Sequence, residues 1–422
     1  MSDRSSPPLP ELLRVFGRIG VLSFGGPAAQ IALMHRELVE RRDWLEDQDF
    51  LRALSFCMLL PGPEAMQLAT YAGWRLHGVR GGLIAGTLFV VPGALVIAAL
   101  VALYAAFGAL PLVQAGFLGI KAAVIVIVLQ ALRGLARRAL TTPSAWAIAG
   151  LSFAGIFAFD LPFPLIIAAA ALWGGLAARE VPAAAPAAPP PPSGVHPLRI
   201  ALPWLALWLA PLAALSLAGA PLLAQIGWFF AWLAVVTFGG AYAVLAYMTQ
   251  TVVDGFGWIS AAQMIDALGL AETTPGPLIL VTQFVAMLTG QIAGGAGLAI
   301  AAGAVALWAT FLPCFLWIFL AAPYLERLAA RPRLAAALRG ITAAVSGVIL
   351  NLSLWFALHV LFDRIGQYDL GPLSLPRPDP GALDVTALAL VALAALLMPV
   401  AKRGMGETLA ALAAAGVVCA YL

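Results

Sequence analysis

Three ionisable side chains lie inside apolar stretches of this sequence, where a charge requires a partner or a function. Lys121 lies near the middle of an apolar run at about 112–132, and Asp266 and Glu272 lie in another at about 262–290. A charge at membrane depth is costly, so such residues usually face the protein interior or water. A lysine there can neutralise part of an oxyanion, and a carboxylate there can carry or gate a proton. The structural alternative is an ion pair for Lys121, and capping or arginine pairing for the two acids.

Glycine and proline interrupt four apolar segments of the chain. The interruptions are Phe24-Gly25-Gly26-Pro27, Pro61-Gly62-Pro63, Phe238-Gly239-Gly240-Ala241 and Pro275-Gly276-Pro277. Proline removes a backbone hydrogen bond, and unsatisfied backbone groups are costly in hydrocarbon, so such breaks persist where the backbone lines a protein cavity. A helix that restarts after a break points free N–H groups into that cavity, which favours an anion. A packing kink is the alternative for each break alone, but four symmetric breaks favour a binding site.

Polar side chains accompany the breaks. Gln67 and Thr274 can form neutral hydrogen bonds, and Arg18 can offer a forked donor to an oxyanion or else extend toward the lipid headgroups. We predict no catalytic residues, Glu272 and Asp266 for proton coupling or gating, and Arg18 as a further anion partner. The predicted substrate-binding residues are Gly25, Gly26, Pro27, Pro61, Gly62, Pro63, Gln67, Lys121, Gly239, Gly240, Thr274, Pro275, Gly276 and Pro277.

The breaks recur because the sequence contains two copies of one unit. The two Pro-Gly-Pro motifs lie 214 residues apart, as do the two Phe-Gly-Gly motifs. Further on, Gly119-Ile120-Lys121-Ala122-Ala123-Val124 returns 221 residues later as Gly340-Ile341-Thr342-Ala343-Ala344-Val345, which indicates a seven-residue insertion in the second copy. Two homologous halves in a membrane chain are typical of transporters that alternate access around a site between the repeats.

The composition predicts a membrane protein. The residues are 62% hydrophobic and 10% charged, against about 25% charged in soluble domains. We predict an all-α polytopic membrane protein with two inverted-topology repeats, broken or re-entrant helices, and roughly 13 membrane segments. The predicted parts are a first repeat at 1–180, an Ala/Pro-rich linker at 181–198, a connecting transmembrane helix at 199–220, and an inverted second repeat at 221–422.

The arginines support the inverted relation. Cytoplasmic loops of membrane proteins are rich in Lys and Arg, and Arg133, Arg137 and Arg138 follow one first-copy segment while Arg331 and Arg333 precede a second-copy segment. The single connecting helix crosses the membrane once, so the second copy would start on the opposite side and have the inverted orientation. Arg36, Arg41 and Arg42 would fall on the outside, unless the first two segments are re-entrant. We expect a multi-pass protein of the cytoplasmic membrane.

Several function classes find no support in the sequence. The three cysteines have no metal or CxxC spacing, and the four histidines are scattered, so we expect no metal and no cofactor. A nucleophile–base constellation and a phosphate-binding glycine loop are both missing from the sequence, so neither an enzyme nor an ATP-driven pump is expected. The net charge of +3 is small and does not indicate nucleic-acid binding.

The motifs around the breaks resemble the chromate ion transporter family in its long, two-domain form. The resemblance covers about 12–135 and 225–360, and its most specific part is the run 269–279, which reads GLAETTPGPLI. It implies efflux of chromate from the cytoplasm, chromate resistance, and drive from the membrane potential or a proton gradient. Ala241 in place of a proline, and Glu64 beside a signature loop, depart from the family pattern and leave the preferred oxyanion open.

Other functions remain alternatives at this point. The same machinery could carry sulfate, which shares the charge and shape of chromate. A membrane-embedded enzyme would need a redox motif or a polar catalytic cluster, and a non-transporting subunit would have little use for Lys121, Asp266 and Glu272. The expected partners are chromate or a similar oxyanion, the lipid bilayer and a second copy in a homodimer, with no nucleic acid.

Overall fold

A computed structural model describes residues 7–177, 197–238, 240–324, 331–371 and 373–421. The predicted linker therefore lies outside the described residues, except for its last two positions. The first copy contains α1 (Leu9–Leu22), α2 (Gly26–His35), the π-helical turn η1 (Arg36–Glu40), α3 (Asp47–Cys57), α4 (Glu64–Phe107), α5 (Pro111–Ala139), α6 (Pro143–Phe159) and α7 (Phe163–Ala177). The connecting helix is α8 (Pro197–Leu217).

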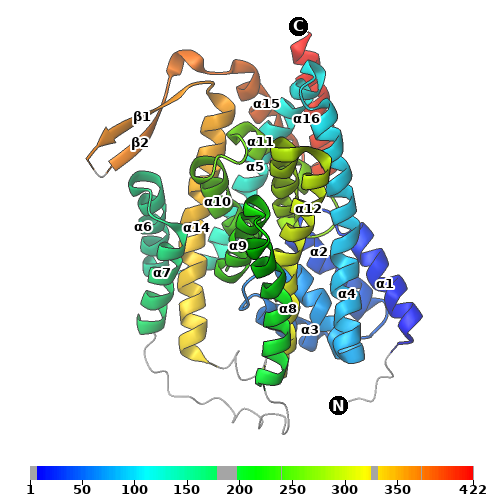
Figure 1. The fold of residues 1–422 in the computed structure, drawn as a ribbon. Coiled ribbons are helices and arrows are strands. Elements are labelled where there is room, and N and C mark those ends of the chain that lie inside the picture. Colours follow the sequence, from blue (N-terminus) through cyan, green and yellow to red (C-terminus); the bar gives the residue numbers. More distant parts are fainter. Residues whose placement is uncertain (1–6, 178–196, 239, 325–330, 372, 422) are drawn as a thin grey trace. The chain divides into compact units, whose positions relative to one another are not determined.

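The second copy repeats this order of elements (Figure 1). It contains α9 (Pro221–Val236), α10 (Ala241–Thr249), the π-helical turn η2 (Gln250–Gly255), α11 (Ala261–Glu272), the 3₁₀ turn η3 (Leu278–Leu280), α12 (Val281–Ala321), η4 (Ala322–Tyr324) and α14 (Pro332–Leu361). A hairpin, β1 (Ile365–Leu370) and β2 (Leu373–Pro378), is followed by η5 (Pro380–Ala382), α15 (Val385–Ala395), η6 (Leu396–Val400) and α16 (Met405–Ala420).

Local sequence sets many of these boundaries. Proline has a fixed φ and lacks an N–H, which suits the first turn of a helix, and several helices start on one: α5, α6, α8, α9 and α14. The hydroxyl of Thr142 accepts from the N–H of Ala145 at the start of α6, and the carboxylate of Asp384 accepts from Ala387 at the start of α15. Each of the four predicted breaks coincides with a helix end in the structure.

The two long helices share one kink. In α4, His77 and Gly78 leave helical geometry with φ/ψ of −137°/27° and 60°/−151°. In α12, Gly294 and Gly295 adopt nearly the same pair, −163°/18° and 78°/−167°. The second residue of each pair has a positive φ that favours glycine. The long helices of the two copies therefore bend through the same pair of backbone conformations.

The chain divides into two compact units, and each combines parts of both copies. Unit 1 comprises Met1–Ala102, Glu180–Ala241 and Ala271–Arg331, and unit 2 comprises Leu103–Arg179, Tyr242–Leu270 and Pro332–Leu422. In unit 1, α12 packs against α8 and α9, and the indole of Trp208 donates to the carbonyl of Ala309 at 3.0 Å. Large buried aromatic side chains, among them Phe16, Phe89 and Phe284, fill the core of this unit.

In unit 2, α14 packs against α5, α6 and α7, while α15 and α16 cover α5. Small residues permit the closest approach: a Cβ at Gly119 of α5 would stand 1.9 Å from the carbonyl oxygen of Leu412 in α16. Close backbone approach through small residues is how membrane helices gain packing energy where no hydrophobic effect drives them together. The core there includes Ala122, Ala123, Val126, Ile127, Leu390, Ala394, Leu409 and Leu412.

A short β-hairpin accompanies the helices in unit 2, in a stretch for which the sequence analysis predicts no element. β1 and β2 pair antiparallel from Ile365↔Pro378 to Leu370↔Leu373. Pro376 and Pro378 argue against a strand in the sequence, because proline cannot donate to a ladder. A two-stranded ribbon tolerates them, since each strand has one unpaired edge.

Within the described residues, five helical stretches are long and apolar enough to cross a membrane: Glu64–Phe107, Pro111–Ala139, Pro197–Leu217, Leu278–Tyr324 and Pro332–Leu361. Shorter apolar helices of 10–17 residues accompany them. The chain is a largely helical, multi-pass membrane protein.

Candidate functional site

The breaks of the two copies are joined by reciprocal hydrogen bonds in unit 1. The N–H of Gly62 donates to the carbonyl of Thr237 at 3.0 Å, and the N–H of Gly276 donates to the carbonyl of Ser23 at 2.9 Å. Gly62 and Gly276 are equivalent positions of the two copies, and so are Ser23 and Thr237. Each Pro-Gly-Pro break is therefore bonded to the carbonyl before the Gly-Gly break of the other copy. In this structure each of these two amides already has a backbone acceptor.

The backbone at the second Pro-Gly-Pro break requires glycine at two places. Gly276 has φ +86°, a left-handed conformation that disfavours other residues. Gly93, on α4, passes so close to the break that a Cβ there would stand 2.1 Å from the carbonyl oxygen of Pro275. The positive φ of Gly25, Gly26, Gly62 and Gly240 gives the other breaks the same turning character.

Three buried glutamines brace this region. The amide nitrogen of Gln30 donates to the carbonyl of Gly276 at 2.7 Å, that of Gln67 donates to Pro61 at 2.6 Å, and that of Gln283 donates to Ala94 at 3.0 Å. Among the described residues, the side-chain oxygen of each glutamine has no hydrogen-bond partner. Buried polar atoms are normally satisfied, so these oxygens are places for water or for a proton-bearing ligand.

The remaining predicted residues of unit 1 lie near the same breaks. Thr274 is buried, and its hydroxyl donates to the carbonyl of Ala271 at 2.8 Å at the end of α11. Glu272 is 4% exposed, in the last turn of the same helix. Pro27 occupies the first turn of α2, and Pro61, Pro63, Pro275 and Pro277 flank their glycines. Gly239 lies outside the described residues.

In unit 2, two of the predicted ionisable residues form one cluster with a tyrosine. The ammonium nitrogen of Lys121 on α5 lies 3.3 Å from the Oδ1 atom of Asp266 on α11. The hydroxyl of Tyr104, at the end of α4, donates to Oδ2 of the same carboxylate at 2.9 Å. Helices α5 and α11 approach closely because Gly269 faces Ile120. Sequence reasoning missed Tyr104, since nothing local to that residue indicates a partner 162 positions away.

The predicted anion partner Arg18 is an exposed residue of α1 whose charge acts on Glu37. Glu37 is 2% exposed, and its carboxylate accepts from Arg41 at 2.6 Å and from Arg42 at 2.5 Å. Burial opposes the ionisation of Glu37, but Arg42, Arg41 and Arg18 together hold its pKa below the ordinary value. This arginine cluster was not predicted as a unit.

His35 forms a second ionic cluster in the same loop. Its ring nitrogens lie 2.6 Å from Asp47 and 3.1 Å from Glu40. The hydrogen bond to Asp47 is the largest cause that raises the pKa of His35, and Glu40 adds to it, while burial opposes both.

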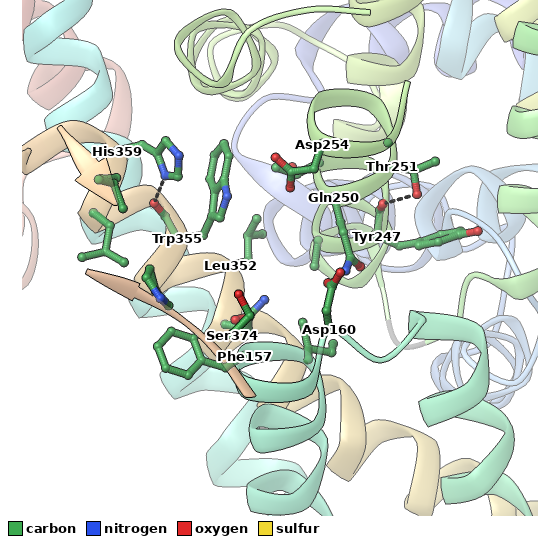
Figure 2. Close-up of a pocket in the computed structure, with 18 of the residues that line it drawn as sticks. Phe157, Asp160, Tyr247, Gln250, Thr251, Asp254, Leu352, Trp355, His359 and Ser374 are labelled. Carbon is green, nitrogen blue, oxygen red and sulfur yellow. Dashed lines mark hydrogen bonds between the residues drawn. The ribbon is translucent and has the colours of Figure 1, made fainter. Parts of the chain in front are cut away.

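A cavity of about 720 Å³ lies in unit 2, apart from every predicted site residue. Figure 2 shows Trp355 and His359 of α14 on one side of it and Asp254 and Gln250 of η2 on the other. The amide of Gln250 donates to Asp160 at 2.5 Å. Burial raises the pKa of Asp254, with His359 opposing and Asp160 adding to the rise. Two carboxylates against one imidazole make this cavity unsuited to a dianion.

The described residues contain no group of three or more His, Cys, Asp or Glu side chains that could hold a metal ion. The predicted site residues fall into two groups. One is the set of hydrogen-bonded breaks in unit 1, and the other is the pair of Lys121 and Asp266 with Tyr104 in unit 2.

Comparison with known proteins identifies the family. The model of the chromate transporter family matches residues 10–175 and 224–420. A probable chromate transport protein of Synechococcus elongatus is 33% identical over 391 residues, which cover 90% of this chain and 94% of that protein. A chromate transport protein of Cupriavidus metallidurans is 33% identical over 84% of each chain, and one of Pseudomonas aeruginosa is 34% identical over 86% of this chain and 85% of that protein. No solved structure matches the chain. These matches span both copies, so the chain belongs to the chromate transporter family.

Proposed function

We propose that this protein is a secondary transporter that exports chromate, a tetrahedral dianion, across the cytoplasmic membrane and so confers chromate resistance. Membership of the family and relatives named for chromate transport support the substrate. The observation that carries the mechanism is the reciprocal bonding of the breaks, Gly62 to Thr237 and Gly276 to Ser23. Sulfate, with the same charge and shape, is the alternative cargo.

The reciprocal bonds support an inverted-repeat arrangement. A two-fold axis that relates two copies makes every contact between them occur twice with the roles exchanged. The bonds at the breaks have this form. In inverted-repeat transporters the axis lies in the membrane plane and the binding site lies at the repeat interface. The breaks of this chain then mark the region where one copy rocks against the other.

The short helices at the breaks support re-entrant segments. Helices α2 and α3 have 10 and 11 residues, so they are about 15 Å and 16 Å long, about half of the ~30 Å hydrocarbon core. Each is too short to cross alone. A re-entrant path returns the loop with Arg36, Arg41 and Arg42 to the cytoplasm, as the positive-inside rule requires. Labelling of a Glu40→Cys variant, in a Cys419→Ser background, with an impermeant thiol reagent from each side tests this placement.

The remaining predicted residues receive defined roles in this proposal. The amides of Gly62 and Gly276 are hydrogen-bonded to Thr237 and Ser23. The oxyanion therefore depends on side-chain donors and on the positive charge of Lys121. Gln67 and Thr274 hold the shape of the breaks, and Glu272 gates or carries a coupling proton from its buried position.

Chromate uptake into inside-out membrane vesicles, with and without an energised membrane, tests the proposal. Energy-dependent accumulation that requires this protein supports export from the cytoplasm. Excess sulfate that abolishes the uptake would favour the alternative cargo. Uptake equal to that of vesicles without the protein, with the protein present and folded, would overturn the proposal.

A further inference from the structure

We infer that Lys121, Asp266 and Tyr104 form a charge-exchange switch, in which a proton on Asp266 frees the Lys121 ammonium to bind the oxyanion. This inference rests on the proposed function and deepens it. It assigns a positioning role to Tyr104, and it predicts that a proton travels with the oxyanion rather than against it.

The first support is the contact geometry of the carboxylate. Its Oδ2 atom accepts a hydrogen bond from Tyr104 at 2.9 Å, whereas Oδ1 lies 3.3 Å from the Lys121 nitrogen without a hydrogen bond of good alignment. The tyrosine thus fixes the position of the carboxylate, and the lysine is held mainly by charge. An ion pair of this kind can be exchanged without rebuilding a hydrogen-bond network.

The second support is an asymmetry of exposure within the pair. The side chain of Lys121 is 19% exposed, and that of Asp266 is 7% exposed. The ammonium therefore keeps an open side where an anion can approach, while the carboxylate is enclosed by its partners. Among the described residues, the titratable groups that contact Asp266 are the ammonium of Lys121 on α5 and the neutral phenol of Tyr104 on α4, and Glu272 lies further along its own helix.

Elementary electrostatics then sets the order of events. When Asp266 is ionised, it repels a dianion that approaches Lys121. The single ammonium would then have to neutralise three negative charges, two on the dianion and one on Asp266. A proton on Asp266 removes the competing charge, so the ammonium can pair with the oxyanion. When the oxyanion leaves, Asp266 gives up its proton and Lys121 pairs with it again. The empty carrier is therefore neutral at this point.

The lysine–aspartate pair is present at one of the two sets of positions that the sequence repeat makes equivalent. The equivalents of Lys121 and Asp266 in the other copy are Thr342 and Arg52. The hydroxyl of Thr342 donates to its own helix, at Leu338, and Arg52 lies 3.7 Å from Asp49. A structural pair required by the fold of each copy would be expected twice, whereas a substrate switch is needed once.

The consequence for energy coupling is specific. If one proton accompanies each dianion, one net negative charge leaves the cytoplasm in each cycle. The membrane potential, negative inside, then drives export, and the proton gradient opposes it.

The test measures equilibrium binding of radiolabelled chromate to the purified full chain in nanodiscs across neutral to alkaline pH. For the wild type, one-proton linkage predicts that affinity falls about tenfold per pH unit above the midpoint. Asp266→Asn should abolish that fall, so that it binds chromate more tightly than the wild type at alkaline pH. Chromate itself takes up a proton, but its speciation is the same for both proteins, so the ratio of their affinities isolates Asp266.

Further variants keep the result interpretable. Tyr104→Phe removes a donor to the ionised carboxylate and should move the midpoint to higher pH, and Lys121→Arg should retain the pH dependence. Asp254→Asn, at an exposed acid of unit 2, is the control and should behave as the wild type. Weaker binding of Asp266→Asn at every pH, or an unchanged slope in it, overturns the switch. If Asp266→Asn does not fold, an unmoved midpoint in Tyr104→Phe overturns it. Absence of chromate binding by the wild type would instead contradict the proposed function.

Discussion

The N–H of Gly276 donates to the carbonyl of Ser23, 253 positions earlier in the chain, and the equivalent pair, Gly62 and Thr237, makes the same bond. The two bonds join each Pro-Gly-Pro break to the other copy. They explain how irregular backbone is tolerated in an apolar chain, because each break satisfies polar groups of the other.

The first prediction concerns the Pro-Gly-Pro break at Gly276, whose N–H bonds the carbonyl of Ser23. Gly276→Ala should destabilise the protein by about 1–2 kcal/mol, because φ is +86° and the new Cβ would stand 3.1 Å from a methyl carbon of Leu280. Chromate transport should fall with it. Thermal unfolding in detergent measures the change. The control is Gly297→Ala, where a Cβ meets nothing within 4 Å; equal stability losses in the two variants would refute the assignment.

The second prediction concerns the approach of α4 to the same break. Gly93→Ala should cost about 1–3 kcal/mol or more, because its Cβ would overlap the carbonyl of Pro275, and backbone yields less than a side chain. Gly134→Ala on α5 has open space and serves as its control. A Gly93→Ala protein as stable and active as the Gly134→Ala protein would show that this contact is dispensable.

The third prediction concerns Glu272. At saturating chromate, where binding no longer limits the rate, Glu272→Gln should flatten the pH dependence of transport while the protein still folds. The reason is that a buried carboxylate which gates a proton must change charge in each cycle. Glu407→Gln, at an exposed acid of α16, is the control. A pH profile of Glu272→Gln that matches the control would remove the proton role.

The fourth prediction concerns the arginine cluster around Glu37. Its pKa is lowered in the folded protein, so its stabilisation is present above the unfolded pKa and is lost as the pH falls through the folded value. Glu37→Gln should cost about 2 kcal/mol at neutral pH, a figure reduced because Arg41 is half exposed. The difference in unfolding temperature from the wild type should shrink in acid, and a constant difference would contradict the account.

The fifth prediction concerns His35, where the sign is opposite. Its pKa is raised in the folded protein, so its stabilisation is present below the unfolded pKa and is lost as the pH rises through the folded value. His35→Gln should therefore lower the unfolding temperature in mild acid and have little effect at alkaline pH. A loss that is larger at alkaline pH would show that packing against Phe50, rather than charge, is what the ring provides.

The sequence predicts the parts of this fold that depend on local chemistry. The positions of proline and glycine predicted where the breaks and many helix starts lie. The repeat predicted that the breaks of one copy would have equivalents in the other. The partners across the fold were not predictable: Tyr104 on Asp266, or Ser23 on Gly276, are contacts that tertiary packing selects. The hairpin was missed because its prolines oppose a strand locally. The buried state of Glu37 was missed because a run of mixed charges normally indicates a solvated loop.

The most direct test of chromate export uses the purified protein in proteoliposomes, with a membrane potential set by a potassium gradient and valinomycin. If the protein alone moves chromate, and net negative charge moves with it, an inside-positive potential should accelerate chromate uptake above that of protein-free vesicles. Uptake that equals the protein-free rate at every potential would contradict the central claim.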